Sequence, residues 1–367
     1  MKKMMITTAL ATSLIAGVAS ADTSVSAYIE TTIGSGETPA TSDQTNQGTT
    51  IGYEHGLSFS GSKDLDNGMT LKTYFDIEDG DAGDARGITF VTGDTQIMIE
   101  ADVNNIDDKQ AVPTIINKIE DGNKGLGVSY NANKKTIHND NGIGVVQKFD
   151  MATVSLKYVP KTATGAGFND SNPNSANKGS GMAYGFTGGF GIDGLNILYS
   201  RSQQTNGGLS TQEPVQTVMG ASYNFGNIKV GAQHTQYDDV NGSYSYSAGA
   251  EAEALSYAAT MAVNDQLSVG IQYAEFEASN LSADEEITSF SAGYNLGGAT
   301  IGLQYHEAEN VGGTAGKDGE AIELRLKPGH ESFLMDELVT VTGRLELNRI
   351  DISSGVYIMH DATAIKN

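Results

Sequence analysis

The sequence predicts an all-β protein, a transmembrane antiparallel up-and-down β-barrel, and three observations lead to this fold class. Apolar and polar residues alternate with a period of two over segments of about eight to twelve residues. The connections between these segments are short and long in turn. The chain is only 38% hydrophobic, and its 367 residues include 45 glycines and no cysteine, so neither membrane helices nor disulfides can build the fold. A barrel fits, because one face of each strand meets lipid, the other lines water, and the ring closes on itself.

Residues 1–21 have the features of a secretory signal peptide. Lys2 and Lys3 precede an apolar run from Ile6 to Val18, and Ala19-Ser20-Ala21 fits cleavage before Asp22. The run is shorter than the roughly 20 apolar residues that a membrane-spanning helix needs. We therefore expect export, and removal of two lysines from a chain whose net charge is already −23.

The remaining chain repeats one strand pattern, with an apolar face and a polar face. A tyrosine often stands at the end of the apolar set of a segment, as Tyr158, Tyr223, Tyr273 and Tyr305 do. This position predicts an aromatic girdle at a lipid–water boundary. The alternation is clearest in six segments, which are Met69–Ile77, Ala152–Tyr158, Val215–Phe225, Leu267–Tyr273, Ala299–Tyr305 and Ile322–Leu326.

The alternating connections predict hairpins whose long loops all lie at one end of the barrel. Sixteen strands up to Lys327 would use about 19 residues each, which suits tilted strands that span a bilayer. The short turns are Asp64–Gly68, Gly93-Asp94, Phe149–Met151, Gly191–Gly194, Phe225–Asn227, Val263–Asp265 and Leu296–Gly298. The long loops are Gly34–Thr49, Asp79–Ala85, Asp102–Asn141, Pro160–Gly181, Gln204–Glu213, Asp238–Tyr246, Ser279–Glu286 and Asn310–Asp318.

A soluble β-sandwich or a β-solenoid is the competing fold, since strands alternate there too. Greek-key sandwiches mix connection lengths, whereas here the lengths alternate along the whole chain. A solenoid needs a constant motif at a period of about 20–30 residues, and none is present. We therefore favour the barrel.

Four segments together carry a family resemblance. They are GLSFSGSKDLDNGMTLKTYFDIE (Gly56–Glu78), NDNGIGVVQKFDMATVSLKYVP (Asn139–Pro160), YNFGNIKVGAQH (Tyr223–His234) and GYNLGGATIGLQYHEAE (Gly293–Glu309). In this order they resemble the second and third strands, the hairpin after the inward loop, and later hairpins of the general bacterial porins, the trimeric sixteen-stranded channels of Gram-negative outer membranes. The resemblance covers roughly residues 1–328. It implies a homotrimeric pore for passive diffusion of small hydrophilic solutes and ions, embedded in outer-membrane lipid including lipopolysaccharide, with a third loop folded inward as a constriction.

The C-terminal residues depart from this family, which ends in a strand with an aromatic last residue. Here strand sixteen would reach Pro328, and residues 329–367 follow, ending in Asn367. Alternation between Val339 and Leu347 lets this extension form a further strand. We expect a barrel over residues 22–328 with sixteen strands; eighteen strands, with one more hairpin from the extension, is the alternative.

Charged residues nominate a pore constriction. In the family picture, acids of the third loop, here about residues 102–141, face basic residues on the barrel wall, so that a transverse field filters solutes. The alternative is that the loop acids are only solvated and the wall cations pair across strands. The loop acids are Asp102, Asp107, Asp108, Glu120 and Asp121. The inward wall residues expected from strand parity are Lys72, Lys157, Lys229, Glu323, Arg325 and Lys327, with Glu30 and Glu100 as further inward acids.

The acidic run from residue 76 to 84 is a weak candidate for a Ca²⁺ site. Oxygen-rich loops can bind Ca²⁺, but the spacing does not match the twelve-residue EF-hand loop. An acidic surface loop is the simpler interpretation, and we expect no other cofactor. The candidate ligands are Asp76, Glu78, Asp79, Asp81 and Asp84.

Charge and motifs exclude other function classes. A net charge of −23 argues against nucleic acid as a partner, since phosphate binding needs clustered Lys and Arg. The six histidines are scattered and no catalytic motif is present, so we expect no enzyme. A negative potential at the pore mouths predicts weak cation selectivity. A substrate-specific channel, or a structural or adhesive barrel without an open pore, remain the alternatives.

Overall fold

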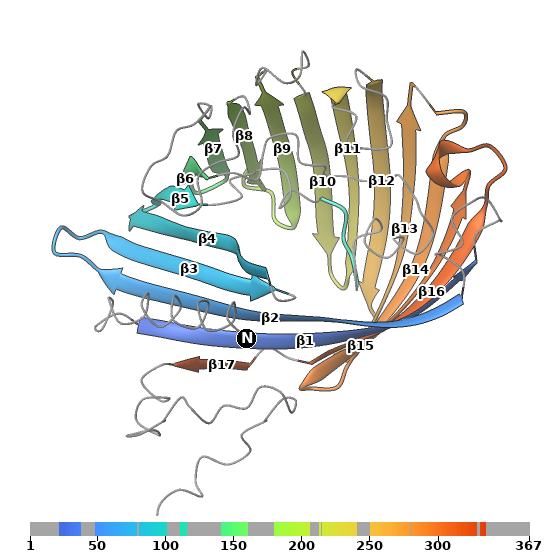
Figure 1. Cartoon of the computed structure of the whole chain (residues 1–367), viewed down its shortest axis with the longest axis horizontal. Coiled ribbons are helices and arrows are strands. Elements are labelled where there is room, and N and C mark those ends of the chain that lie inside the picture. The colour runs from blue at the N-terminus through green and yellow to red at the C-terminus, as the bar shows by residue number, and fades with distance from the viewer. Residues whose placement is uncertain are drawn as a thin grey trace, which may run out of the picture.

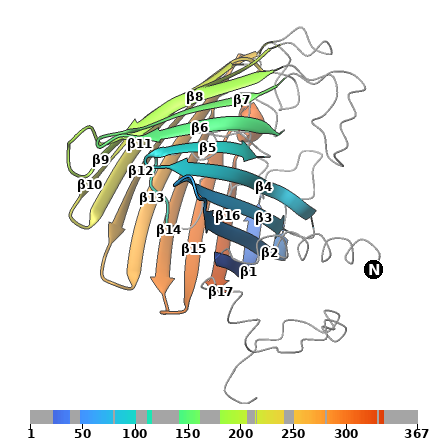
Figure 2. The ribbon, with the colours of Figure 1, turned by 90° about the vertical axis from the view of Figure 1, so that its left-hand side faces the viewer.

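The chain forms one antiparallel sheet that closes into a ring (Figures 1 and 2). The computed structural model describes residues 22–37, 48–78, 81–100, 111–115, 141–160, 180–205, 213, 215–240, 250–279, 281–328 and 331–334. The strands are β1 (Asp22–Glu37), β2 (Gly48–Asp64), β3 (Thr70–Glu78), β4 (Asp81–Thr92), β5 (Thr95–Glu100), β6 (Gly142–Lys148), β7 (Thr153–Val159), β8 (Gly181–Gly188), β9 (Leu195–Gln204), β10 (Val215–Phe225), β11 (Ile228–Val240), β12 (Ala250–Ala262), β13 (Leu267–Ala278), β14 (Glu285–Asn295), β15 (Ala299–Glu309), β16 (Gly319–Pro328) and β17 (Glu331–Leu334).

From β1 to β16 each strand pairs with the next, and β1 closes the ring. One edge of β1 pairs with β2, and the other edge pairs with β16 and then with β17. Thr31 lies opposite Leu326 of β16, and Ser24 lies opposite Leu334 of β17, so the register shifts by one residue between the two pieces. β17 is therefore the continuation of β16, and the ring has sixteen strand positions, as predicted. No further strand enters the ring among the described residues, and residues 335–367 lie outside them.

The period-two alternation places apolar side chains on the outer surface. On β13 and β15, Ile271 and Leu303 are each 45% exposed, while their neighbours Gln272 and Gln304 are buried on the inner face. Aromatic pairs lie on the outside as well: Tyr257 stacks on Tyr273 near the middle of β12 and β13, and Tyr223 stacks on Phe225 next to a short turn. This is the exterior that a lipid-embedded barrel needs.

Glutamates replace the apolar residues on the outer face at the loop end of β12–β16. Several of them lie directly opposite one another on neighbouring strands. These pairs are Glu253 with Glu277, Glu275 with Glu286, Glu286 with Glu309, and Glu307 with Glu320. We call this set the outer glutamate rows.

The short turns have the backbone that tight hairpins require. Gly68, Gly93, Gly226 and Gly297 adopt positive φ angles between 54° and 91°, which a residue with a Cβ adopts only under strain. The prediction of a long loop at Asp79–Ala85 was wrong. β3 extends to Glu78 and β4 begins at Asp81, because the alternating pattern continues through the acidic run and the backbone stays in the ladder.

The inner face of β11–β16 is apolar near the loop end. A cluster of buried side chains there joins the short 3-10 turn η3 (Val311–Gly313), and Leu281 packs against it. The cluster contains Tyr237, Ala252, Ala254, Ala274, Phe276, Ala278, Ile287, Ala308, Val311 and Ala321. None of the helical segments described is long and apolar enough to cross a membrane.

Candidate functional site

All six wall residues nominated from the sequence lie on the inner face of the ring. The strand register places them on the same face as Gln233 and Gln272, whose side chains hold residues 111–115 inside the barrel. Arg86, in contrast, lies opposite the outward-facing Phe75. The six residues are Lys72 on β3, Lys157 on β7, Lys229 on β11, and Glu323, Arg325 and Lys327 on β16.

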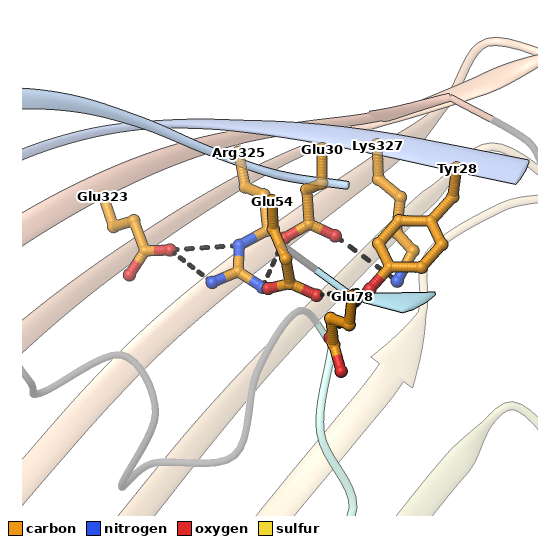
Figure 3. A network of polar contacts seen from close by, with 7 residues as sticks. All are labelled: Tyr28, Glu30, Glu54, Glu78, Glu323, Arg325 and Lys327. Carbon is orange, nitrogen blue, oxygen red and sulfur yellow. Dashed lines mark hydrogen bonds and ion pairs between the residues drawn. The ribbon is translucent and has the colours of Figure 1, made fainter. Parts of the chain in front are cut away.

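Arg325 is the centre of an ion-pair network where β16 meets β1 (Figure 3). Its guanidinium lies 2.6 Å from an oxygen of Glu30 and 2.9 Å from an oxygen of Glu323. Lys327 reaches the second oxygen of Glu30 at 3.3 Å. Glu30 is only 4% exposed, and these two cations are the charged partners of its buried carboxylate.

Tyr28 lies two residues before Glu30 on the same face of β1, and its phenol faces two further carboxylates (Figure 3). Its phenol lies 2.9 Å from Glu54 on β2 and 2.8 Å from Glu78 on β3. One phenolic proton can serve only one of these carboxylates at a time. Among the described residues neither glutamate has a basic partner, so this part of the wall carries net negative charge.

A second ion pair lies further round the ring. Lys157 on β7 contacts Glu100 on β5 at 2.9 Å, and the Tyr74 phenol donates to the other oxygen of Glu100 at 2.9 Å. The pair is largely shielded, with side-chain exposures of 10% and 9%. Lys157, Arg325 and Lys327 are thus neutralised by acids of the wall itself, which is the local pairing weighed as the alternative for these cations.

The segment Ala111–Ile115, called here the inner segment, lies inside the ring against β10–β14 (Figure 1, short cyan stretch). The Ala111 N–H donates to Gln233 at 2.8 Å, and the Gln272 amide donates to the Pro113 carbonyl at 3.2 Å. In a ring of sixteen positions, β12 stands opposite β4, so this covered wall faces the charged wall of β1–β7 across the lumen. A path for solutes would run between the two.

Other nominated residues lie outside what the structure describes. These are all five loop acids, Asp102, Asp107, Asp108, Glu120 and Asp121, together with Asp79 of the Ca²⁺ candidates. The backbone at Asp81 and Asp84 belongs to β4, and Glu78 accepts from Tyr28. No group of three or more potential metal ligands occurs among the described side chains, and the Ca²⁺ site stays a prediction.

Sequence reasoning missed Tyr28, Glu54 and Tyr74 as partners within the charged wall. Their parity is visible in the sequence, because each alternates with apolar residues of the same strand. What the sequence lacks is the register, which brings Tyr28 beside a glutamate 50 residues away. The two glutamines that hold the inner segment were missed for the same reason.

Comparisons with known proteins identify a family for the chain and solved structures with a similar fold. A family model described as Gram-negative porin matches residues 7–321. A search of curated protein sequences returned no match. Among solved structures, a porin refined at 1.8 Å resolution is 11% identical, with 83% of this chain and 99% of that chain covered and a TM-score of 0.58. The OmpT protein of Vibrio cholerae is 15% identical, with 83% and 98% covered and a TM-score of 0.56. A mutant of the Rh. blastica porin is 16% identical, with 83% and 99% covered and a TM-score of 0.54.

Proposed function

The chain belongs to the Gram-negative porin family, whose members are channels of the outer membrane, and we propose that it forms a water-filled pore for passive diffusion of small hydrophilic solutes and ions. The observation that carries this proposal is the inner wall, where charged and polar side chains line a closed ring. Glu30, Glu100 and Arg325 all face the lumen, while the outer face is largely apolar apart from the outer glutamate rows at the loop end. A wall of this kind stabilises water and hydrated ions rather than a packed core.

Weak cation selectivity is the finer part of the proposal. Three wall cations are neutralised by wall acids, whereas Glu54 and Glu78 face a phenol. Lys72 and Lys229 also face the lumen, so the named wall charges balance in number, and the surplus of negative charge is local to Glu54 and Glu78. Such a local surplus raises the concentration of cations beside it and lowers that of anions. The net charge of −23 acts in the same direction.

The test is the reversal potential of single channels in planar lipid bilayers under a KCl gradient. Wild-type protein should give stable conductance steps and a reversal potential of the sign that marks K⁺ preference. The double variant Glu54→Gln/Glu78→Gln should move the K⁺-to-Cl⁻ permeability ratio toward one, because it removes wall charge without changing side-chain size.

Glu307→Gln is the matched control. Glu307 lies on the outer face of β15, so this variant loses a carboxylate of the same type outside the lumen and should leave the ratio close to wild type. Anion preference in the wild-type channel would refute the selectivity proposal. Solute-dependent block of the current would favour a substrate-specific channel, and absence of conductance would favour a structural barrel.

We also propose a homotrimer that contacts lipopolysaccharide and other outer-membrane lipids, on the basis of the family resemblance. Light scattering on detergent-solubilised protein, corrected for bound detergent, would give three times the mass of the chain. A monomeric mass in detergents that preserve conductance would contradict this assembly.

A further inference from the structure

The inner segment lies unusually close to the backbone of the barrel wall. Ala111 is 2% exposed and Val112 is 9% exposed, although both belong to a connection rather than to a strand. The hydrogen bonds of Ala111 and Pro113 described above use backbone groups of the segment, and the wall supplies both partners from buried glutamine side chains. The wall therefore holds the backbone of the segment directly.

Four glycines of the inner face lie directly beneath the segment. They come from four strands and follow a slanted row around the ring, where adjacent positions are also small, such as Ala258 between the second and the third glycine. We call this set the glycine seat: Gly220 on β10, Gly231 on β11, Gly270 on β13 and Gly293 on β14.

The first half of the seat contacts the start of the segment. A Cβ added to Gly220 would lie 2.6 Å from the Cβ of Ala111. A Cβ added to Gly231 would clash with the backbone carbonyl oxygen of Ala111 and lie 2.8 Å from Cδ of Pro113. Backbone and a proline ring cannot rotate away, so a side chain at Gly231 must push the segment off the wall.

The second half of the seat contacts the end of the segment. A Cβ at Gly270 would lie 2.9 Å from Cγ1 of Ile115, and a Cβ at Gly293 would lie 2.9 Å from its Cγ2. Ordinary contacts between carbon atoms are about 3.5–4.0 Å, so a side chain at either position would be crowded unless Ile115 moves. Here the obstacle is a flexible side chain, which can adjust by rotating.

We propose that the glycine seat sets the width of the pore, by letting the inner segment lie against the wall instead of projecting into the lumen. Glycine inside a strand weakens it and often marks close approach of another backbone, which is the situation at Gly231. The segment covers β10–β14 and faces the charged wall, so its height above the seat determines the free cross-section between them. This inference rests on the proposed function as a diffusion pore.

The first test compares single-channel conductance in planar bilayers. Gly231→Ala should lower the conductance, because the segment must move toward the lumen axis. Gly293→Ala should lower it less, since it meets only the Ile115 side chain. Gly34→Ala is the control: Gly34 also lies on the inner face, but a Cβ there would be 3.9 Å from its nearest neighbours, and the conductance should not change.

Equal conductance of Gly231→Ala and wild type would overturn the proposal, and so would an equal decrease in Gly34→Ala. Heat-modifiable electrophoretic mobility should show that each variant forms a barrel. If Gly231→Ala does not fold, Gly293→Leu takes its place, with a larger side chain and a decrease in conductance still expected.

The second test does not depend on conductance. The chain has no cysteine, so the pair Ile115→Cys/Gly293→Cys would contain the only two thiols. The contact at 2.9 Å suits a disulfide, in which the sulfur of one cysteine lies about 3 Å from the Cβ of the other. Rapid cross-linking on mild oxidation supports the seat even if the protein conducts no current, and the absence of cross-linking in folded protein would overturn it.

Discussion

Arg325 stabilises the charged wall, because its guanidinium contacts two carboxylates that would otherwise lie close together without a positive charge between them. We expect Arg325→Gln to lower the free energy of unfolding by about 2 kcal/mol, since Glu30 and Glu323 lose a charged partner. Urea unfolding followed by far-UV circular dichroism measures this difference in vesicle-embedded protein. The single-channel permeability ratio should move further toward cations in the same variant.

Lys327→Gln is the comparison for this prediction. Lys327 also contacts Glu30, but at 3.3 Å and with 52% of its side chain exposed. Exposed ion pairs contribute about 0–1 kcal/mol, so the loss should be clearly smaller than for Arg325. An equal loss in the two variants would mean that exposure does not matter at this site.

For residues of the pore wall, the sequence predicts which face of the sheet each side chain occupies, but not which partner it contacts. Strand parity placed Lys72, Lys157 and Arg325 toward the lumen, and the register agrees. Which side chains meet was not predictable, because Tyr28 and Glu78 are adjacent only after β1, β2 and β3 pair. The burial of Gln216, Gln272 and Gln304, which leave side-chain atoms without a hydrogen-bond partner, has no signal in the sequence; ordered water usually serves such atoms.

The strand that closes the barrel consists of two pieces, β16 and β17, and this division was not predictable from the sequence. Pro328 has no N–H for the ladder, so the sequence predicts that the strand ends there. The ladder resumes at Glu331, with a register shift of one residue, and β17 covers Ser24–Ala27 of β1. The number of strands follows from the periodicity of the sequence. The continuation of β16 as β17 depends instead on pairing with β1, about 300 residues earlier in the chain.

We expect truncation after Pro328 to impair folding much more than truncation after Leu334. Without β17, backbone groups on one edge of β1 lose their partners, and an unpaired group in lipid costs several kcal/mol. The fraction of heat-modifiable protein after refolding into vesicles measures the difference. Equal fractions for the two truncations would show that β16 alone closes the ring.

Charge acts on the scale of the whole molecule. The wall acids and the net charge of −23 together create a negative potential at the pore. Salt screens such a potential over about 10 Å at 0.1 M and about 3 Å at 1 M. The cation preference should therefore be stronger in KCl gradients below 0.1 M than in gradients that reach 1 M.

Reversal potentials measured at constant gradient and increasing mean concentration test this expectation. A permeability ratio that does not change with salt would assign selectivity to contacts at the wall alone. In that case the Glu54→Gln/Glu78→Gln variant would still change the ratio, and the net charge of the whole chain would have no part in it.

Ring closure also has an evolutionary consequence. Each strand is held by backbone hydrogen bonds to two neighbours, so the architecture makes few demands on any one inward side chain. A lineage can then replace lumen residues one at a time and alter permeation without rebuilding the scaffold. Such drift accounts for solved barrels that share only 11–16% of their residues with this chain and yet align over 98–99% of their own length.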